Sequence, residues 1–194
     1  MDAINFKARF ITNTTVRKFN SLSGKYDNKV VSLVEMNKES SNDKLALFKI
    51  SELWNNGTNF VKTILLSLNC PNKNEKNVYI LTEQKDNFGK LIPEKILGIE
   101  EVKKEGNSYR LDYIQTNPKT KYKAKGRTYK GIGECLLNFV LDKFGKNYKI
   151  HLNSVYEAVD FYKKFGFYMM DKTISDPLMT HFPFRDAKAG KNGK

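Results

Sequence analysis

Two glycines one residue apart, Gly131 and Gly133, stand directly before an apolar run with helical spacing in the stretch YKGIGECLLNFV, residues 129–140. The first turn of a helix presents unpaired backbone N–H groups and a partial positive charge, so it attracts anions. Glycine has no Cβ, which lets a phosphate approach the backbone closely. The pattern alone is a weak signal, and it leaves open a polyphosphate site or an ordinary glycine-containing start of a helix. A nucleotide-kinase loop is excluded because no Gly-Lys-Ser/Thr follows, and the third glycine of a dinucleotide fold is missing.

The segment that leads into this glycine pair is strongly basic. Residues 119–130, KTKYKAKGRTYK, contain six Lys or Arg and no acidic residue, and the whole chain carries a net charge of +13. Such a charge attracts polyanions, including nucleic acid, a nucleotide-like cofactor or an acidic protein face. A solvated lysine-rich surface explains the same composition equally well. The sequence therefore suggests a polyanion contact through 119–130 without choosing the polyanion.

A second stretch, NSVYEAVDFYKKFGF at residues 153–167, follows one predicted strand downstream. Together and in this order, the two stretches resemble the GCN5-related N-acetyltransferase (GNAT) superfamily over roughly residues 78–184. The family's Q/R-x-x-G-x-G/A loop corresponds to Thr128 through Gly133. Its strand, Asn and closing helix correspond to Asn153, Ala158, Phe161, Tyr162, Gly166 and Phe167.

The resemblance implies an N-acetyltransferase that moves an acetyl group from acetyl-CoA to a primary amine by direct attack on the thioester. Loop amides would then bind the pyrophosphate of acetyl-CoA. Thr128 stands where the family has Gln or Arg, and Arg127 lies one place earlier, so Arg127 or Lys130 is expected to reach phosphate instead. This departure also permits the alternative of a non-catalytic GNAT-fold module that binds acyl-CoA or nucleic acid. The residues that the resemblance places at the cofactor are Ile114, Thr116, Arg127, Thr128, Tyr129, Lys130, Gly131, Ile132, Gly133, Asn153 and Tyr162.

Acetyl transfer needs an acid for the leaving thiolate, a base for the amine and a donor for the carbonyl oxygen. By resemblance Tyr162 is the acid, since a phenol stays protonated at neutral pH; the alternative is a half-buried tyrosine of the helix core. Asn153 would bind the pantetheine arm or the amine side, and a backbone N–H near Ile114–Thr116 would bind the oxyanion. The base is open between Glu100, Asp112 and a water relay.

Other residues with reactive side chains receive structural interpretations. His151 and His181 are isolated and are interpreted as satisfied polar residues, and Cys135 as a residue of a helix core or rim. The two cysteines, Cys70 and Cys135, are far apart and form neither a disulfide framework nor a metal cluster, so no metal is expected. This cysteine use predicts a reducing, cytoplasmic compartment.

The elements that must position these residues alternate between strand and helix patterns. Ser154 and Glu157 predict a capping box, and Gly166 predicts a left-handed helix end. Residues 86–90 and 105–107 have hairpin composition, residues 20–28 look like a turn-rich linker, and a strand is the alternative for 60–69. Strands are predicted at 5–12, 29–36, 77–84, 94–104, 108–116, 146–154, 166–172 and 178–184, and helices at 41–54, 60–69, 132–144 and 155–165.

This order predicts an α+β fold of the three-layer GNAT type, with a mixed, mostly antiparallel twisted sheet flanked by helices. Residues 1–184 are expected to form a single domain, with 1–70 supplying N-terminal strands and acceptor-side helices and 185–194 a flexible basic tail. No apolar run approaches the ~20 residues that span a bilayer. The segment 41–69 lacks a dense acidic cluster, which disfavours a cationic acceptor. The acceptor stays open between a small molecule, a protein and aminoacyl-tRNA, and the chain between monomer and homodimer.

Overall fold

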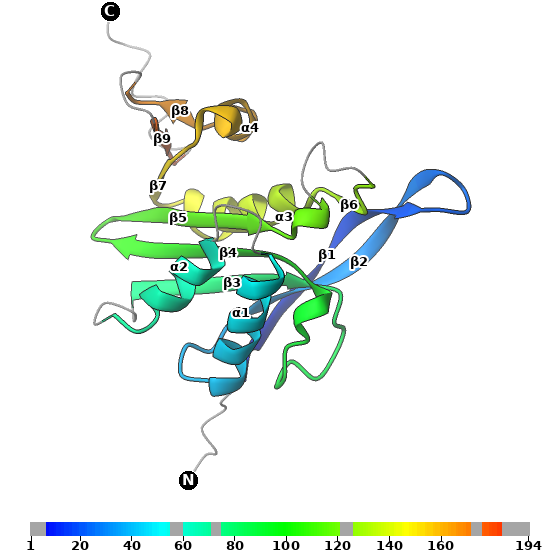
Figure 1. Cartoon of the computed structure of the whole chain (residues 1–194). Coiled ribbons are helices and arrows are strands. Elements are labelled where there is room, and N and C mark those ends of the chain that lie inside the picture. The colour runs from blue at the N-terminus through cyan, green and yellow to red at the C-terminus, as the bar shows by residue number, and fades with distance from the viewer. Residues whose placement is uncertain (1–6, 55–59, 71–74, 121–125, 172–175, 184–194) are drawn as a thin grey trace, which may run out of the picture. The chain divides into compact units, whose positions relative to one another are not determined.

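The computed structural model describes residues 7–54, 60–70, 75–120, 126–171 and 176–183. Within them, nine strands pair in the order β6-β1-β2-β3-β4-β5-β7-β9-β8 (Figure 1). Strands β5 and β7 are parallel, and the pairs β1–β2, β1–β6, β2–β3, β7–β9 and β8–β9 are antiparallel. The predicted α+β class with a mixed, mostly antiparallel sheet is confirmed.

The chain forms two compact units. The first contains residues 1–101 and 113–136, and the second contains residues 102–112 and 137–194. The strands are β1 (Arg9–Asn20), β2 (Lys25–Glu35), β3 (Lys76–Thr82), β4 (Ile96–Glu105), β5 (Ser108–Thr116), β6 (Tyr129–Lys130), β7 (Lys149–Asn153), β8 (Tyr168–Met169) and β9 (Leu178–His181). The helices are α1 (Ser41–Leu53), α2 (Phe60–Ser67), α3 (Ile132–Val140) and α4 (Val159–Lys164).

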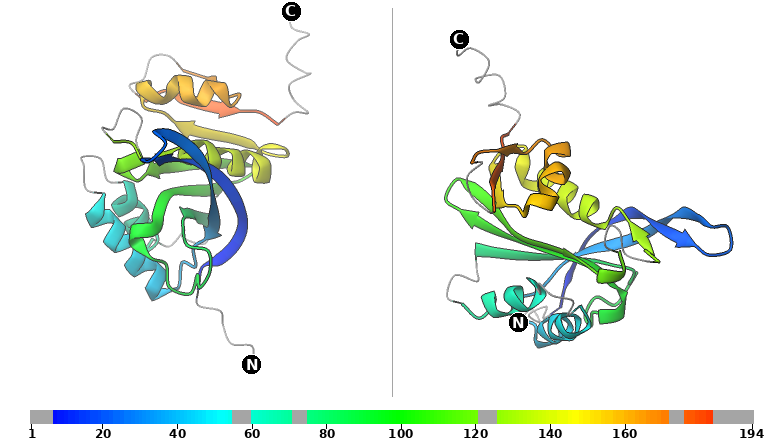
Figure 2. Two further views of the ribbon diagram at one scale, coloured as in Figure 1. Left: turned by 90° about the vertical axis from the view of Figure 1, so that its right-hand side faces the viewer. Right: turned by 45° about the horizontal axis from the view of Figure 1, so that its top comes forward.

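The first unit begins with a long hairpin, β1–β2, where two short strands and a linker were predicted. The register runs from Arg9 opposite Glu35 to Asn20 opposite Lys25, so most of the predicted linker at 20–28 is strand. The Asn20 side chain accepts the amides of Leu22 and Ser23, and Gly24 has a φ of +65°, which closes a tight turn. Strand β2 pairs with β3 only over Ser32–Glu35, so much of the hairpin extends past β3 (Figures 1 and 2).

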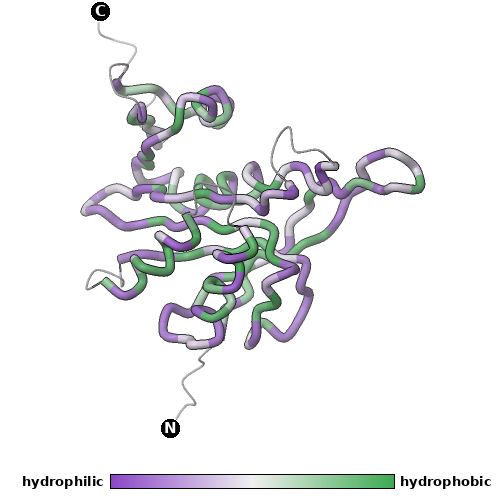
Figure 3. Tube along the Cα trace, in the orientation of Figure 1, coloured by the Kyte–Doolittle hydropathy of each residue, from purple (hydrophilic) through white to green (hydrophobic). Residues whose placement is uncertain are grey.

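Helices α1 and α2 bury the main apolar cluster of the first unit, and both predicted helices are confirmed. Helix α1 starts where predicted because the Ser40 hydroxyl accepts the amide of Asp43 at 3.2 Å. The side-chain oxygen of Gln115 on β5 accepts the amide of Val61 at 3.0 Å, which satisfies an otherwise unpaired N–H in the first turn of α2. The buried members of the cluster include Leu47, Ile50, Ile64, Leu68, Ile80, Ile96 and Ile99. Figure 3 shows hydrophobic residues gathered there, whereas the β4–β5 turn is hydrophilic.

The loop between β3 and β4 is longer than the hairpin predicted at 86–90. Gln84 is buried, and its amide nitrogen donates to the carbonyl oxygens of Asp86, Asn87 and Lys90. Its amide oxygen accepts the N–H of Ile92 at 3.0 Å. One side chain therefore organises a wide loop, which turn composition alone does not reveal. The second predicted hairpin joint is confirmed, since β4 and β5 are joined at Gly106, which has a φ of +57°.

The first turn of α3 packs directly on Gly98 of β4. A Cβ at Gly98 would lie 2.6 Å from Ile132 Cγ2 and 3.0 Å from Leu136 Cδ1. We expect Gly98→Ala to lower the free energy of unfolding by about 1 to 3 kcal/mol, because the helix must shift to admit the methyl group. Urea unfolding followed by circular dichroism measures the change. The control is Gly89→Ala, whose Cβ meets nothing closer than 3.5 Å; equal losses in both variants would contradict the packing argument.

The second unit packs the end of α3 and helix α4 around β7. The Tyr109 ring stacks on Phe144 with centroids 4.1 Å apart, and Ile150, Leu152 and Met179 are buried. The predicted helix at 132–144 ends at Val140 and continues as one π-helical turn, Leu141–Gly145. Strands β8 and β9 lie inside the predicted segments 166–172 and 178–184 but are shorter. The predicted tail, 185–194, lies outside the described residues.

Helix α4 differs from its prediction at the start and agrees with it at the end. The capping box at Ser154 is wrong: its hydroxyl donates to the carbonyl oxygen of Val155, and a 3₁₀ turn, Tyr156–Ala158, precedes α4. The end is confirmed. Gly166 has a φ of +82°, its amide donates to Lys163 O, and the Phe167 amide donates to Tyr162 O. These two bonds satisfy the last carbonyls of the helix.

Candidate functional site

Gly131 forms the entry into α3. It has a φ of +87°, a conformation that favours glycine, and its carbonyl accepts the Cys135 amide at 2.9 Å. Gly133 lies inside the helix and does not need a positive φ. The two glycines therefore have different roles. Gly131 permits the positive φ of the turn, and Gly133 is a position in the first turn of α3 that carries no side chain. The sequence suggested the amides of this turn as anion-binding groups, and that role stays a prediction.

The N-terminal hairpin holds this entry in place. Strand β6 pairs with β1, with Tyr129 opposite Lys18 and Lys130 opposite Arg17. The Phe19 amide donates to Thr128 O at 2.8 Å, and the Tyr26 hydroxyl donates to Arg127 O at 2.8 Å. Two backbone carbonyls just before the glycine turn are thus anchored on residues far away in the sequence.

Arg127 and Lys130, which were expected to reach phosphate, make contacts within the first unit. Arg127 Nε donates to the carbonyl oxygens of Thr120 and Tyr129, at 2.9 and 2.8 Å, so that nitrogen stabilises the loop backbone. The Lys130 ammonium lies 3.9 Å from the centroid of the Tyr26 ring. Phosphate contacts by either side chain stay a prediction. Lys121, Lys123 and Lys125 of the basic segment lie outside the described residues.

Lys18, Glu83 and Tyr129 form a polar cluster that sequence reasoning missed. Tyr129 is only 4% exposed, and burial together with the nearby Glu83 carboxylate raises its pKa to about 12. Lys18 Nζ binds Glu83 Oε1 at 3.1 Å and lies over the Tyr129 ring. Burial opposes ionisation of Glu83, but the Tyr129 hydroxyl and the Lys18 ammonium together outweigh it and hold the pKa of Glu83 below its usual range. The Tyr129 phenol is therefore protonated at neutral pH.

In the second unit, α4 and β7 position the two residues that the resemblance singled out there. Tyr162 is half-buried, and its ring meets the Phe167 ring edge-to-face with centroids 5.7 Å apart. Its carbonyl oxygen accepts the amides of Phe165 and Phe167 at the end of α4. Ring packing and backbone hydrogen bonds therefore both hold Tyr162 in place. Asn153 is exposed at the end of β7 and donates from Nδ2 to Asp176 O at 3.2 Å.

Strands β5 and β7 pair over only three positions. The register begins at Ser108 opposite Lys149 and ends at Arg110 opposite His151, although β7 continues to Asn153. Ile114 and Thr116, from which an oxyanion donor was expected, lie further along β5 and are half-buried.

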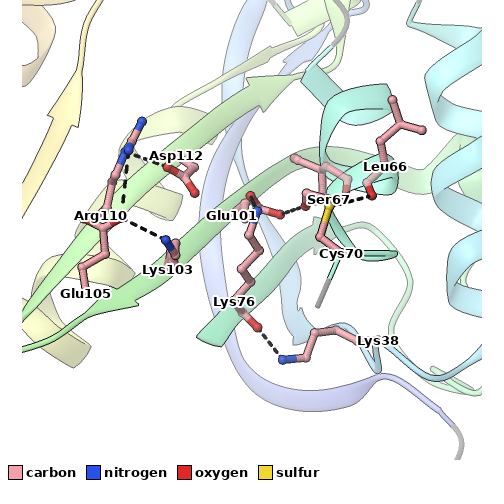
Figure 4. Close-up of polar contacts among 11 residues, drawn as sticks. Lys38, Leu66, Ser67, Cys70, Lys76, Glu101, Lys103, Glu105, Arg110 and Asp112 are labelled. Atoms are coloured by element: carbon pink, nitrogen blue, oxygen red, sulfur yellow. Dashed lines mark hydrogen bonds and ion pairs between the residues drawn. The ribbon is translucent and has the colours of Figure 1, made fainter. Parts of the chain in front are cut away.

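The two candidate bases, Glu100 and Asp112, have different surroundings; Figure 4 shows Asp112 and the neighbouring Glu101. Glu100 is fully buried on β4. Asp112, whose side chain is 11% exposed, binds Arg110 Nε at 2.8 Å. Neighbouring Glu101 is buried and pairs with Lys76 at 3.1 Å. Of the two predicted carboxylates, Asp112 has the greater access to solvent.

His151 has a carboxylate partner. Its Nε2 lies 3.0 Å from Glu105 Oε2, and Lys103 binds the other oxygen of Glu105 at 3.2 Å. Burial opposes ionisation of Glu105, but Lys103 and His151 outweigh it and keep the pKa of Glu105 below its ordinary value. This contact agrees with the interpretation of His151 as a satisfied polar residue. It also orients the ring at the last paired position of β7.

The sequence matches one family model, described as an acetyltransferase (GNAT) domain, over residues 79–186. This match covers more than half of the chain. The chain belongs to the GNAT acetyltransferase family. The match contains the glycine turn, Asn153 and Tyr162, and it leaves out the β1–β2 hairpin and α1. A comparison with curated proteins found no match.

Solved structures agree with the GNAT fold. The ribosomal-protein-S18-alanine N-acetyltransferase of Escherichia coli superposes with a TM-score of 0.55 at 14% identity, covering 84% of this chain and 99% of that one. The PaiA N-acetyltransferase of Thermoplasma acidophilum, in complex with coenzyme A, gives 0.51 at 17% identity, with 78% and 99% covered. Tetrahymena GCN5 gives 0.51 at 13% identity, with 77% and 94% covered. At these identities the likeness shows the fold.

Two further observations bear on the chemistry of this GNAT domain. Burial raises the pKa of the Cys135 thiol, and Cys135 Sγ lies 3.3 Å from Thr15 O, so this cysteine is not arranged as a nucleophile. Among the described residues, no group of three His, Cys, Asp or Glu side chains could hold a metal ion. In the same part of the chain, no helix is both long and apolar enough to span a bilayer.

Proposed function

We propose that this GNAT domain transfers an acetyl group from acetyl-CoA to a primary amine by direct attack on the thioester. The observation that carries the proposal is the glycine turn at Gly131, held by β6 and followed by a glycine in the first turn of α3. The amides of residues 128–133 would bind the pyrophosphate. Gly133 adds no side chain to the first turn of α3, and the pairing of β6 with β1 holds the turn before ligand binding. Such a preformed helix start suits a polyphosphate because little reorganisation is needed on binding.

Acetyl-CoA supplies an activated acyl group, and the residues of the chain manage the protons. The amine nitrogen bonds to the acetyl carbon, the carbon–sulfur bond breaks, and the thiolate takes the proton of the Tyr162 hydroxyl. A backbone N–H of β5 near Ile114–Thr116 would stabilise the carbonyl oxygen as it becomes negative. The proton of the amine passes to Asp112, to Glu100 or to water, and the exposure of Asp112 favours it over the buried Glu100. Asn153 would bind the pantetheine arm or the amine side.

A non-catalytic module is the alternative. Thr128 replaces the family's Gln or Arg, and the Nε of Arg127 is occupied by backbone carbonyls. Such a protein would bind acyl-CoA or nucleic acid without turnover. For the enzyme, the acceptor could be a small molecule, a protein or an aminoacyl-tRNA, and the basic segment 119–130 could contact a polyanionic part of it. A cytoplasmic location is proposed from the cysteine use described above. The chain stays open between monomer and homodimer.

We expect acetyl-CoA to raise the melting temperature, and CoA to do so nearly as well, because a ligand that binds only the native state stabilises it by mass action. Differential scanning fluorimetry measures the shift, and native mass spectrometry detects the bound CoA. Adenosine is the control, since it lacks the pyrophosphate. A folded protein that shows no shift at millimolar acetyl-CoA contradicts the acetyltransferase proposal, and binding without any thiol release supports the module.

A further inference from the structure

The part of the hairpin that extends past β3 has one face with aromatic and cationic side chains. Residues directly opposite in an antiparallel pair share a face, so Phe19 lies with Tyr26, Arg17 with Asn28 and Thr15 with Val30. Lys130 of β6 is opposite Arg17, and its contact with the Tyr26 ring confirms that it is on the same side. We call this surface the aromatic face; it consists of Thr15, Arg17, Phe19, Tyr26, Asn28, Val30 and Lys130.

The aromatic face is exposed and preorganised. The Phe19 residue is 41% exposed and Val30 is 54% exposed. The rings of Phe19 and Tyr26 meet edge-to-face with centroids 5.3 Å apart. The Tyr26 hydroxyl is fixed to Arg127 O, so its ring cannot swing away. The Tyr26 ring is therefore held in place, with Lys130 against it and the exposed Phe19 ring beside it.

The acidic residues of this region lie off the aromatic face. Asp27 is opposite Lys18 and so belongs to the other face, where Asn20 donates to it at 2.8 Å. Glu83 is bound by Lys18, which also belongs to that other face. The aromatic face thus carries Arg17 and Lys130 with no carboxylate among its members. This separation favours an anionic ligand on the aromatic face, because the lysines of the other face, Lys18, Lys25 and Lys29, lie with Asp27 and near Glu83.

We propose that the aromatic face binds single-stranded RNA. Unstacked bases can lie on Phe19 while phosphates contact Arg17 and Lys130, which is the combination that single-stranded nucleic acids require. A duplex hides its base faces and would leave the aromatic rings unused. The exposed Thr15 and Asn28 on the same face offer hydrogen-bond partners for a 2′-hydroxyl. A second copy of the chain suits the face poorly, because each copy carries the same net charge of +13.

The first experiment tests stacking. Fluorescence anisotropy would measure the affinity of the full chain for a fluorescein-labelled 12-nucleotide RNA of mixed sequence. Phe19→Leu keeps an apolar side chain but removes the aromatic ring, and we expect about tenfold weaker binding. The same sequence as DNA should bind more weakly than RNA. Undiminished binding by Phe19→Leu overturns the proposal, and equal affinity for RNA and DNA contradicts the assignment to RNA.

The second experiment tests the electrostatic side with a matched pair of double variants. Arg17→Gln with Lys130→Gln removes two charges from the aromatic face, and Lys25→Gln with Lys29→Gln removes two from the opposite face. The slope of log affinity against log salt should fall by about 1.4 in the first pair, since each phosphate contact on a single strand contributes about 0.7. The second pair should change it much less. Equal changes in both pairs would show general charge attraction and overturn the site.

The RNA proposal shares Lys130 with the proposed acetyl-CoA site, so Arg17 and Phe19 serve to test it separately from acetyl transfer. Arg17→Gln and Phe19→Leu alter exposed side chains, so each should keep the wild-type circular dichroism spectrum and the acetyl-CoA melting shift. A protein that binds RNA but not acetyl-CoA contradicts only the acetyl transfer. Multi-angle light scattering tests whether the aromatic face binds a second copy of the chain instead. If the protein is a dimer that Phe19→Leu dissociates, the face is assigned to a second copy and the RNA proposal is overturned.

Discussion

Tyr162→Phe is expected to lower turnover of acetyl-CoA about 100-fold or more while leaving acetyl-CoA binding intact. The variant keeps the ring, and therefore the edge-to-face contact with Phe167, but loses the hydroxyl that would protonate the leaving thiolate. An interaction made mainly in the transition state affects turnover rather than binding. Release of CoA can be followed with a thiol-reactive dye, using slow hydrolysis of acetyl-CoA until an acceptor is known. The melting shift caused by acetyl-CoA checks that the variant still binds the ligand.

The matched control is Tyr168→Phe, which removes the same atom from a residue that is 64% exposed on β8 of the same unit. It should retain wild-type turnover. If Tyr162 is only a packing residue, the outcome differs: loss of a satisfied hydroxyl costs about 1 kcal/mol of stability and leaves the rate almost unchanged. A wild-type rate in Tyr162→Phe would show that water or another group protonates the thiolate.

Gly133→Val is expected to abolish the melting shift caused by acetyl-CoA while the ligand-free protein stays folded. Gly133 lies within α3 and needs no positive φ, so a side chain is compatible with the backbone. The new side chain would occupy the approach of the pyrophosphate to the helix start. Gly131 is unsuitable for this test, because its φ of +87° makes any substitution strained with or without a ligand.

Asn138→Val is the control for the β-branched side chain, since Asn138 is an exposed position further along α3. That variant should keep the acetyl-CoA shift and lose at most the small helix propensity of valine. Isothermal titration calorimetry would confirm the loss of binding in Gly133→Val. Normal binding there would mean that Gly133 only serves helix packing, and the anion site at 128–133 would have to be abandoned.

Local patterns predicted the elements that carry the family resemblance. The apolar periodicity of α1, α2 and α3 and the strand-forming runs of β3, β4 and β5 place these elements nearly where the structure has them. The left-handed end of α4 at Gly166 followed from a rule about one residue type. Each of these signals is contained within a window of about a dozen residues, which is why the sequence alone reveals them.

The features that were missed depend on contacts between distant segments. The hairpin strands contain many polar residues, so only their outer parts, 5–12 and 29–36, were predicted as strand, and 20–28 looked like a turn-rich linker. The capping box at Ser154 matched its motif, but the hydroxyl turns to Val155 O. Lys18 lies on β1, Tyr129 on β6 and Glu83 just after β3, so no spacing pattern in the sequence reveals their cluster. Even the site residues that the resemblance supplied are predictions, because family motifs identify positions and not contacts.

The bond between the Tyr26 hydroxyl and Arg127 O spans 101 positions of the sequence. Contacts at such separations form late in folding, because the intervening chain must first be ordered to bring them together. The glycine turn is therefore expected to complete its conformation after the local helices and the β4–β5 hairpin. Ordering the turn also depends on a hairpin outside the family-matched segment 79–186. A fragment restricted to that segment would keep both glycines and lose the strand that β6 pairs with.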